Sequence, residues 1–184
     1  AEAIDAKSPY TRDHADRVAC LARRLARELG LPPGGVEQVH AGALLHDLGK
    51  LGIPDAILES PDSLAPEERA LMEEHPGKGE KILAPIEGLR ALLPIVRSHH
   101  ENWDGTGYPD RLAGLEIPLA ARIVKVADTF DAITSSRPYR SCDLTTEEAL
   151  AMMEVGRGTL FDPGLLDLFL EMMRREPVHG PAQG

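Results

Sequence analysis

Hydrophobic residues recur along most of the chain at spacings of three and four, which is the period of an amphipathic helix. Val18, Leu21, Leu25 and Leu29 form the first such stripe, and Gly30 follows it as an expected helix C-cap. Alternation of apolar and polar residues, the mark of a half-buried strand, is nearly absent. The pattern therefore predicts an all-α fold, a single irregular helical bundle of about seven or eight helices.

The same period predicts where the later helices lie. We expect helices over residues 35–47, 66–75, 77–84 and 88–100, then one in "LAARIVKVADTFDAI", one in "TTEEALAMM" and one in "DPGLLDLFLEMM". Proline and acidic residues at the start of the third helix, and a Thr-x-x-Glu capping box at Thr145, are helix-entry features. The loop over residues 101–118 is too rich in Gly, Pro and Asp to be regular, and a loop of this length is usually functional or disordered.

Length and composition predict one domain. The chain has 184 residues, of which 42% are hydrophobic, enough for one buried core. We place the domain at 1–175, with 1–7 as the end of a linker helix from an upstream domain and 176–184 as a disordered tail. A leading helix of this kind could also pair two chains as a homodimer.

Charge and apolar runs limit the partners. The formal net charge of -10 argues against binding to a nucleic acid polymer or to an anionic membrane. No apolar run reaches the roughly 18 residues of a membrane span, so we expect no membrane insertion and a cytoplasmic protein. Cys20 and Cys142 lie far apart in the sequence, and we expect both to be reduced core residues.

Histidine and aspartate gather at the predicted helix ends. Five such residues lie at predicted helix ends, and one aspartate lies inside the "ADTFDAI" helix. His14 adds an imidazole from the first helix. The candidate metal ligands are His14, His46, Asp47, His75, His99, His100 and Asp128. Adjacent residues on a helix diverge by about 100°, so the "HD" and "HH" pairs both point to a dinuclear centre.

The donor set narrows the choice of metal. The set has five imidazoles, two carboxylates and no thiolate. Such ligands suit open octahedral sites for Fe, Mn, Zn, Ni or Co better than they suit the closed tetrahedral thiolate sites of structural zinc. Two such cations about 3.5 to 4 Å apart would suit a phosphoryl displacement. Lys50 follows Asp47 by three residues and could reach a phosphate or a leaving group, while Arg137 and Arg140 could pair with phosphate oxygens.

Each of these signals is weak alone. A histidine at a helix end is more often a cap than a ligand, and we expect His40 to be structural. The acids Glu73, Glu74, Glu147 and Glu148 are expected on solvated helix faces. It is the combination within one chain that favours a metal centre.

Three motifs together resemble the HD-GYP family of the HD phosphohydrolase superfamily. They are "HDLGK", "HHENWDGTGYP" and "RIVKVADTFDAITSSRPYR", and the similarity runs from about Ala6 to Phe169. The resemblance implies an all-α domain with a two- or three-metal centre that activates a hydroxide. It implies hydrolysis of cyclic di-GMP to pGpG, and in some members on to GMP.

The resemblance also implies residue roles. One metal would be held by His14, His46, Asp47 and Asp128, and the other by Asp47, His75, His99 and His100. Asp47 would bridge the metals, and Lys50 would contact the scissile phosphate or protonate the leaving oxygen. The residues expected against the nucleotide are Tyr108, Arg137 and Arg140, with Asp131 as a weaker candidate. The two divalent ions would be Fe or Mn, and a GGDEF cyclase domain is an expected partner.

Three positions depart from the family pattern. Tyr10 stands where members with a third metal have a glutamate, so we expect two metals. Ser8 replaces a common acid, and Ser60 replaces a common lysine. Two other functions stay open: a module that senses cyclic dinucleotides or docks a cyclase without turnover, and a phosphodiesterase for another cyclic dinucleotide or a mononucleotide.

Overall fold

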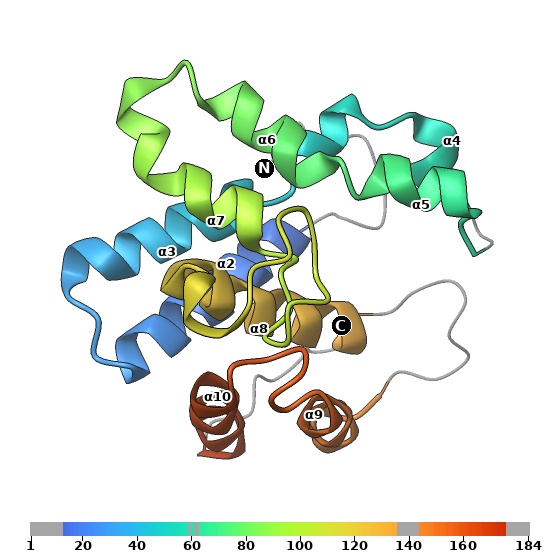
Figure 1. Cartoon of the computed structure of the whole chain (residues 1–184). Coiled ribbons are helices and arrows are strands. Elements are labelled where there is room, and N and C mark those ends of the chain that lie inside the picture. Colours follow the sequence, from blue (N-terminus) through green and yellow to red (C-terminus); the bar gives the residue numbers. More distant parts are fainter. Residues whose placement is uncertain (1–12, 59, 61–62, 136–143, 176–184) are drawn as a thin grey trace, which may run out of the picture.

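The computed structural model describes residues 13–58, 60, 63–135 and 144–175, which fold into a helical bundle (Figure 1). The elements are, in chain order, α2 (His14–Glu28), α3 (Pro33–Leu45), η1 (Leu48–Gly52), α4 (Asp55–Leu58), α5 (Pro66–Met72), α6 (His75–Leu83), η2 (Glu87–Leu92), α7 (Leu93–Ser98), η3 (Gly114–Glu116), α8 (Leu119–Thr134), α9 (Thr146–Val155) and α10 (Pro163–Arg175). Within the described residues there is no β-strand, and eight α-helices accompany the four-residue α4. The predicted all-α class is confirmed.

Helices α2, α3 and α8 pack against one another in the middle of the bundle. Figure 1 shows α6 and α7 on one side of them and α9 and α10 on the other. Leu25, Ala43 and Ile123, one from each central helix, are fully buried. Burial of a leucine or isoleucine side chain contributes about 1.5–3 kcal/mol, so these contacts hold the three helices in fixed register.

The predicted apolar stripe of the first helix is confirmed except at its end. Val18, Leu21 and Leu25 are buried, but Leu29 is 39% exposed because it is the C-cap of α2 and lies beyond the last helical turn. Gly30 follows with a φ of 79°, the left-handed conformation expected after a helix end.

Two helix boundaries differ from the prediction, and a proline explains each. His75 begins α6 and does not close the preceding helix, because Pro76 lies in the first turn of α6. Pro94 similarly lies in the first turn of α7, so residues 88–100 do not form one helix. Helix α7 ends at Ser98, and His99 and His100 follow it. Proline has no N–H for the helix interior but is tolerated in a first turn.

The cysteine prediction is wrong for Cys20, which is exposed on α2. It lies two residues after the buried Val18, about 200° around the helix, and so faces away from the core. Cys142 and the segments 1–7 and 176–184 lie outside the described residues. None of the helices in the described part of the chain has the length and apolar character needed to cross a bilayer.

Candidate metal centre

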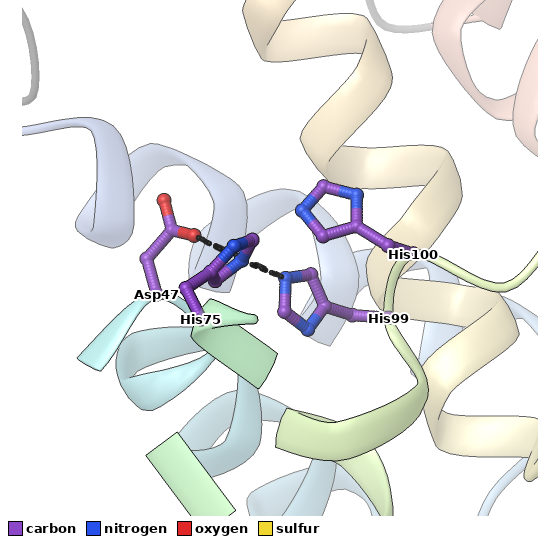
Figure 2. Close-up of side chains that lie close together, drawn as sticks. All are labelled: Asp47, His75, His99 and His100. Carbon is purple, nitrogen blue, oxygen red and sulfur yellow. Dashed lines mark hydrogen bonds and ion pairs between the residues drawn. The ribbon is translucent and has the colours of Figure 1, made fainter. Parts of the chain in front are cut away.

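The seven candidate ligands, which are scattered through the sequence, come together in two clusters that share Asp47. The first cluster is called subsite A and consists of His14, His46, Asp47 and Asp128. The second is called subsite B and consists of Asp47, His75, His99 and His100 (Figure 2). In subsite B, and among His14, His46 and Asp47 of subsite A, the ligand atoms lie within 4.8 Å of one another.

Asp128 completes subsite A from α8, which packs against α2 and α3. Its Oδ1 lies 3.3 Å from His14 Nε2 and 3.8 Å from His46 Nε2. Asp128 lies inside α8, and its carboxylate faces His14 at the start of α2 and His46 at the end of α3.

The two oxygens of Asp47 face different subsites. Oδ2 lies 3.4 Å from His46 Nε2 and 3.9 Å from His14 Nε2. Oδ1 lies 3.3 Å from His75 Nε2 and 3.9 Å from His99 Nε2. A carboxylate placed in this way can offer one oxygen to each of two cations.

A glycine brings Asp47 close to His75. A Cβ atom at Gly49, two residues after Asp47, would lie 1.8 Å from the carbonyl oxygen of His75 and 2.6 Å from the nitrogen of Gly79. Only a residue without a side chain allows this approach of η1 to α6. The "HDLGK" motif therefore needs its glycine to join two ligands from different elements.

Hydrogen bonds fix the tautomer of three of the imidazoles. The Nδ1 atoms of His46, His75 and His99 lie 2.6, 2.8 and 2.8 Å from the carbonyl oxygen of the residue three positions earlier. A carbonyl only accepts, so each Nδ1 carries the proton and each neutral ring keeps an Nε2 lone pair. Nε2 is the atom that faces the cluster, and the other ring N–H is held by a carbonyl, as is usual in histidines that bind metals.

Asp131 has a different set of contacts from the one we expected. We predicted that it contacts the nucleotide, but it is buried and its Oδ2 accepts a 2.7 Å hydrogen bond from His14 Nδ1. Arg17 Nε donates to its other oxygen at 2.6 Å. Because both oxygens already have partners inside the protein, we withdraw the nucleotide contact for Asp131.

Unpaired buried atoms fit a pair of cations. Within the described residues, His46 Nε2 and Asp47 Oδ1 are buried without a hydrogen-bond partner, one on the side of each subsite. Such atoms cost about 1–3 kcal/mol each unless something binds them. The ligand atoms present are imidazole nitrogens and carboxylate oxygens, which suit divalent transition metals.

The charge states of the side chains agree with this fit. Burial lowers the pKa of His100 to about 3 and that of His99 well below its usual value, so both are neutral imidazoles. Burial opposes ionisation of Asp47, but the neighbouring Lys50 and His46 hold the pKa of this carboxyl well below its usual range. Neutral imidazoles and an ionised carboxylate are the forms that bind metals.

His14 differs from these two imidazoles. Burial lowers its pKa, but Asp128 and Asp131 outweigh burial and raise it to about 9. With protein groups alone, His14 is therefore a cation between two carboxylates.

Lys50 lies at the edge of the centre. It belongs to η1, and its Nζ donates to Asp47 Oδ2 at 2.5 Å. Its ammonium group is thus beside the shared carboxylate, on the oxygen that faces subsite A.

The loop over residues 101–118, called the GYP loop after its Gly-Tyr-Pro motif, folds back onto subsite B. The ring of Tyr108 stacks on His100 with centroids 4.8 Å apart and an interplanar angle of 21°. Burial raises the pKa of Tyr108, so its phenol stays protonated and can donate a hydrogen bond. A Cβ atom at Gly107 would lie 2.3 Å from the nitrogen of Asn102, so the loop needs glycine to pack this closely.

Two side chains that hold this loop in place, Arg97 and Lys125, were not among the predicted site residues. Arg97 donates to both oxygens of Asp110, at 2.6 and 2.7 Å, and to Glu80 at 2.5 Å. Lys125 of α8 is half-buried and donates to Asn102 Oδ1 at 2.8 Å. Neither pair has a fixed helical spacing, so no sequence signal could have found them.

The "HH" pair does not indicate two metals. We predicted that adjacent ligands would diverge on a helix, but α7 ends at Ser98 and both His99 and His100 lie in the turn after it. Both rings join subsite B. Of the predicted nucleotide contacts, Arg137 and Arg140 lie outside the described residues, as do Ser8 and Tyr10.

Comparison with known proteins gives consistent similarities. Residues 1–165 match the sequence profile of the family described as HD domain. The chain is 43% identical over 166 residues to a cyclic di-GMP phosphodiesterase of Thermotoga maritima, covering 88% of this chain and 44% of that protein. It is 41% identical over 160 residues to 3'3'-cGAMP-specific phosphodiesterase 3 of Vibrio cholerae, covering 87% of this chain and 35% of that protein.

A similar fold is present in a solved structure of a protein described as HDG"Y"P from Bdellovibrio bacteriovorus. Its TM-score is 0.72 at 23% identity, covering 91% of this chain and 53% of the other. The chain thus spans less than half the length of the two curated relatives named above.

Proposed function

The chain belongs to the HD domain family, in its HD-GYP branch, and we propose that it is a metal-dependent phosphodiesterase that hydrolyses cyclic di-GMP to pGpG. The observation that carries the proposal is the placement of Asp47, whose two oxygens face two separate groups of histidines. A shared carboxylate between two nitrogen-rich subsites can hold two cations close together, as two-metal phosphoryl hydrolysis needs.

The proposed cofactor is a pair of divalent ions, Fe or Mn. When bound, two such ions supply Lewis-acid stabilisation of the phosphate and a water of lowered pKa. The donor set of imidazoles and carboxylates supports Fe and Mn, since both accept mixed nitrogen and oxygen ligands.

The side chains around the centre have proposed roles of their own. Hydrolysis forms a bond from a water oxygen to phosphorus, breaks the bond from phosphorus to the 3' oxygen, and delivers a proton to that departing oxygen. Lys50 lies beside Asp47 and is the proposed contact of the phosphate or donor of this proton. Tyr108 is proposed to bind the nucleotide from its place above His100, and Arg137 and Arg140 to pair with phosphate oxygens.

The product is proposed to be pGpG. Tyr10 replaces the glutamate that members with a third metal carry, so we propose two metals and a reaction that stops after one hydrolysis.

A second cyclic dinucleotide is the other candidate substrate. The relative from Vibrio cholerae that is 41% identical is named as specific for 3'3'-cGAMP. This similarity favours testing 3'3'-cGAMP beside cyclic di-GMP, because the metal ligands act on the phosphate and do not distinguish the bases.

We propose that residues 1–175 are one HD-GYP domain of a cytoplasmic protein. A GGDEF cyclase domain and a second copy of the chain are its proposed partners.

The proposed function is tested by an anaerobic assay of the chain loaded with Fe or with Mn. Cyclic di-GMP and 3'3'-cGAMP are each supplied, and the products are separated by chromatography. Asp47→Asn should abolish turnover, whereas Asp167→Asn, which removes an exposed partner of Arg157, should leave turnover unchanged. Full metal occupancy with both substrates bound but intact would instead establish a sensing or docking module.

A further inference from the structure

His14 reaches subsite A from an unusual place, the first residue of α2. The other ring donors, His46, His75 and His99, each donate Nδ1 to a carbonyl three residues earlier. No turn of α2 precedes His14, and the N-terminal end of a helix offers N–H donors and not carbonyl acceptors. The His14 ring therefore needs a partner from another part of the fold.

Helix α8 supplies that partner. Asp131 Oδ2 accepts from His14 Nδ1 at 2.7 Å, while Asp128 Oδ1 lies 3.3 Å from His14 Nε2. Asp128 and Asp131 are three residues apart and so share one face of α8. One helix thus presents a candidate ligand to subsite A and a carboxylate that holds the neighbouring imidazole.

Asp131 is itself held in place. Arg17, one turn after His14 on α2, donates to its two oxygens at 2.6 and 3.0 Å, and the Ser135 hydroxyl donates to Oδ2 at 3.1 Å. The Asp131 side chain is only 4% exposed. A carboxylate restrained in this way keeps the His14 ring in one orientation.

We propose that Asp131 is a positioning residue for subsite A. It holds His14 as the Nδ1–H tautomer, so that the Nε2 lone pair points to the cation. Subsite B does not depend on it, because backbone carbonyls hold His75 and His99. The inference rests on the proposed metal centre and predicts that the two subsites respond differently to one substitution.

The test is a titration of the metal-free chain with Mn(II), followed by isothermal calorimetry and by electron paramagnetic resonance. Asp131→Ala should weaken one of the two binding events about 10- to 100-fold, the usual effect of losing a partner of a metal-binding histidine. The other event should keep its affinity, which also shows that the variant is folded. Asp131→Asn should lose less, because its amide oxygen can still accept from Nδ1.

Asp167→Asn is the matched control, since it breaks an Arg–Asp pair that contacts no histidine of the centre. A double-mutant cycle with His14→Ala separates positioning from general support: once the imidazole is gone, Asp131→Ala should weaken subsite A no further. Equal weakening of both binding events, or no weakening of either, would overturn the inference. Failure of the unmodified chain to bind two Mn(II) would instead contradict the proposed function.

Discussion

His75 and His99 bring their Nε2 atoms to within 3.2 Å of each other, although both rings donate Nδ1 to the backbone. With both protons on Nδ1, the two Nε2 lone pairs face each other inside the protein. Nitrogen ligands about 2.1 Å from one cation and at right angles would be about 3.0 Å apart. The distance between His75 and His99 is therefore close to that of two ligands of one metal.

Removal of the metal is expected to reduce the contribution of His99 to stability. His99→Gln should cost much less free energy of unfolding in chelator than in Mn(II), where the unmodified chain gains about 2.7 kcal/mol at 100 times its Kd. Urea unfolding with and without Mn(II) measures this difference. Asp167→Asn should cost the same in both conditions, and a His99→Gln cost that does not depend on metal would contradict the prediction.

Arg97 is expected to stabilise the GYP loop in a pH-dependent way. Arg97→Met should cost about 1 kcal/mol at pH 7, a small value because the Arg97–Asp110 pair is a third exposed and water screens it. Hydrogen bonding from Arg97 lowers the pKa of Asp110 below its ordinary value of 3.8. The stabilisation is therefore present above pH 3.8 and is lost as the pH falls through the lowered pKa.

Urea unfolding from pH 7 down to pH 3 checks the prediction for Arg97, and the difference in stability between the two chains should shrink as the pH falls below 3.8. Lys78→Met, which removes an exposed pair with Glu74, is the control for loss of a surface cation. A difference between Arg97→Met and the unmodified chain that grows toward low pH would have the wrong sign. In the substrate assay, Arg97→Met should raise KM more than it lowers kcat, because the loop carries Tyr108.

Two glycines are expected to respond oppositely to the same substitution. Gly107→Ala should cost at least about 2 kcal/mol, because its Cβ would lie 2.3 Å from Asn102 N and 2.6 Å from the carbonyl oxygen of His100. Gly34→Ala, in the first turn of α3 with no atom within 4 Å, should stabilise by up to about 1 kcal/mol. Thermal unfolding compares the two, and similar melting temperatures for both variants would show that the loop can move away.

Lys50 is expected to contribute to the reaction and not to metal binding. Lys50→Met should keep two bound metals and lower kcat about 100- to 10,000-fold, the range for loss of a proton donor. Metal content by mass spectrometry and kcat are measured on the same sample, with Lys78→Met as the control. Loss of metal in Lys50→Met would show that the contact with Asp47 supports the centre itself.

The sequence predicted the helices wherever apolar spacing was regular, as at Val18, Leu21 and Leu25. It failed at His75, which begins α6 with Pro76 in the first turn of that helix, and at His99, which follows the end of α7 at Ser98. The candidate ligands lie together in two clusters that share Asp47. The contacts that support them could not be predicted, since Asp131 meets His14 across 117 positions and only the packing of α2 on α8 brings them together.

The most direct test of the dinuclear centre is anomalous diffraction from crystals of the chain grown with Mn(II). We predict two anomalous peaks about 3.5 to 4 Å apart, one contacting each oxygen of Asp47. The peak near Oδ1 should be bound by His75 and His99, and the peak near Oδ2 by His14 and His46. A single peak at full occupancy, or two peaks that do not share Asp47, would contradict the two-metal site.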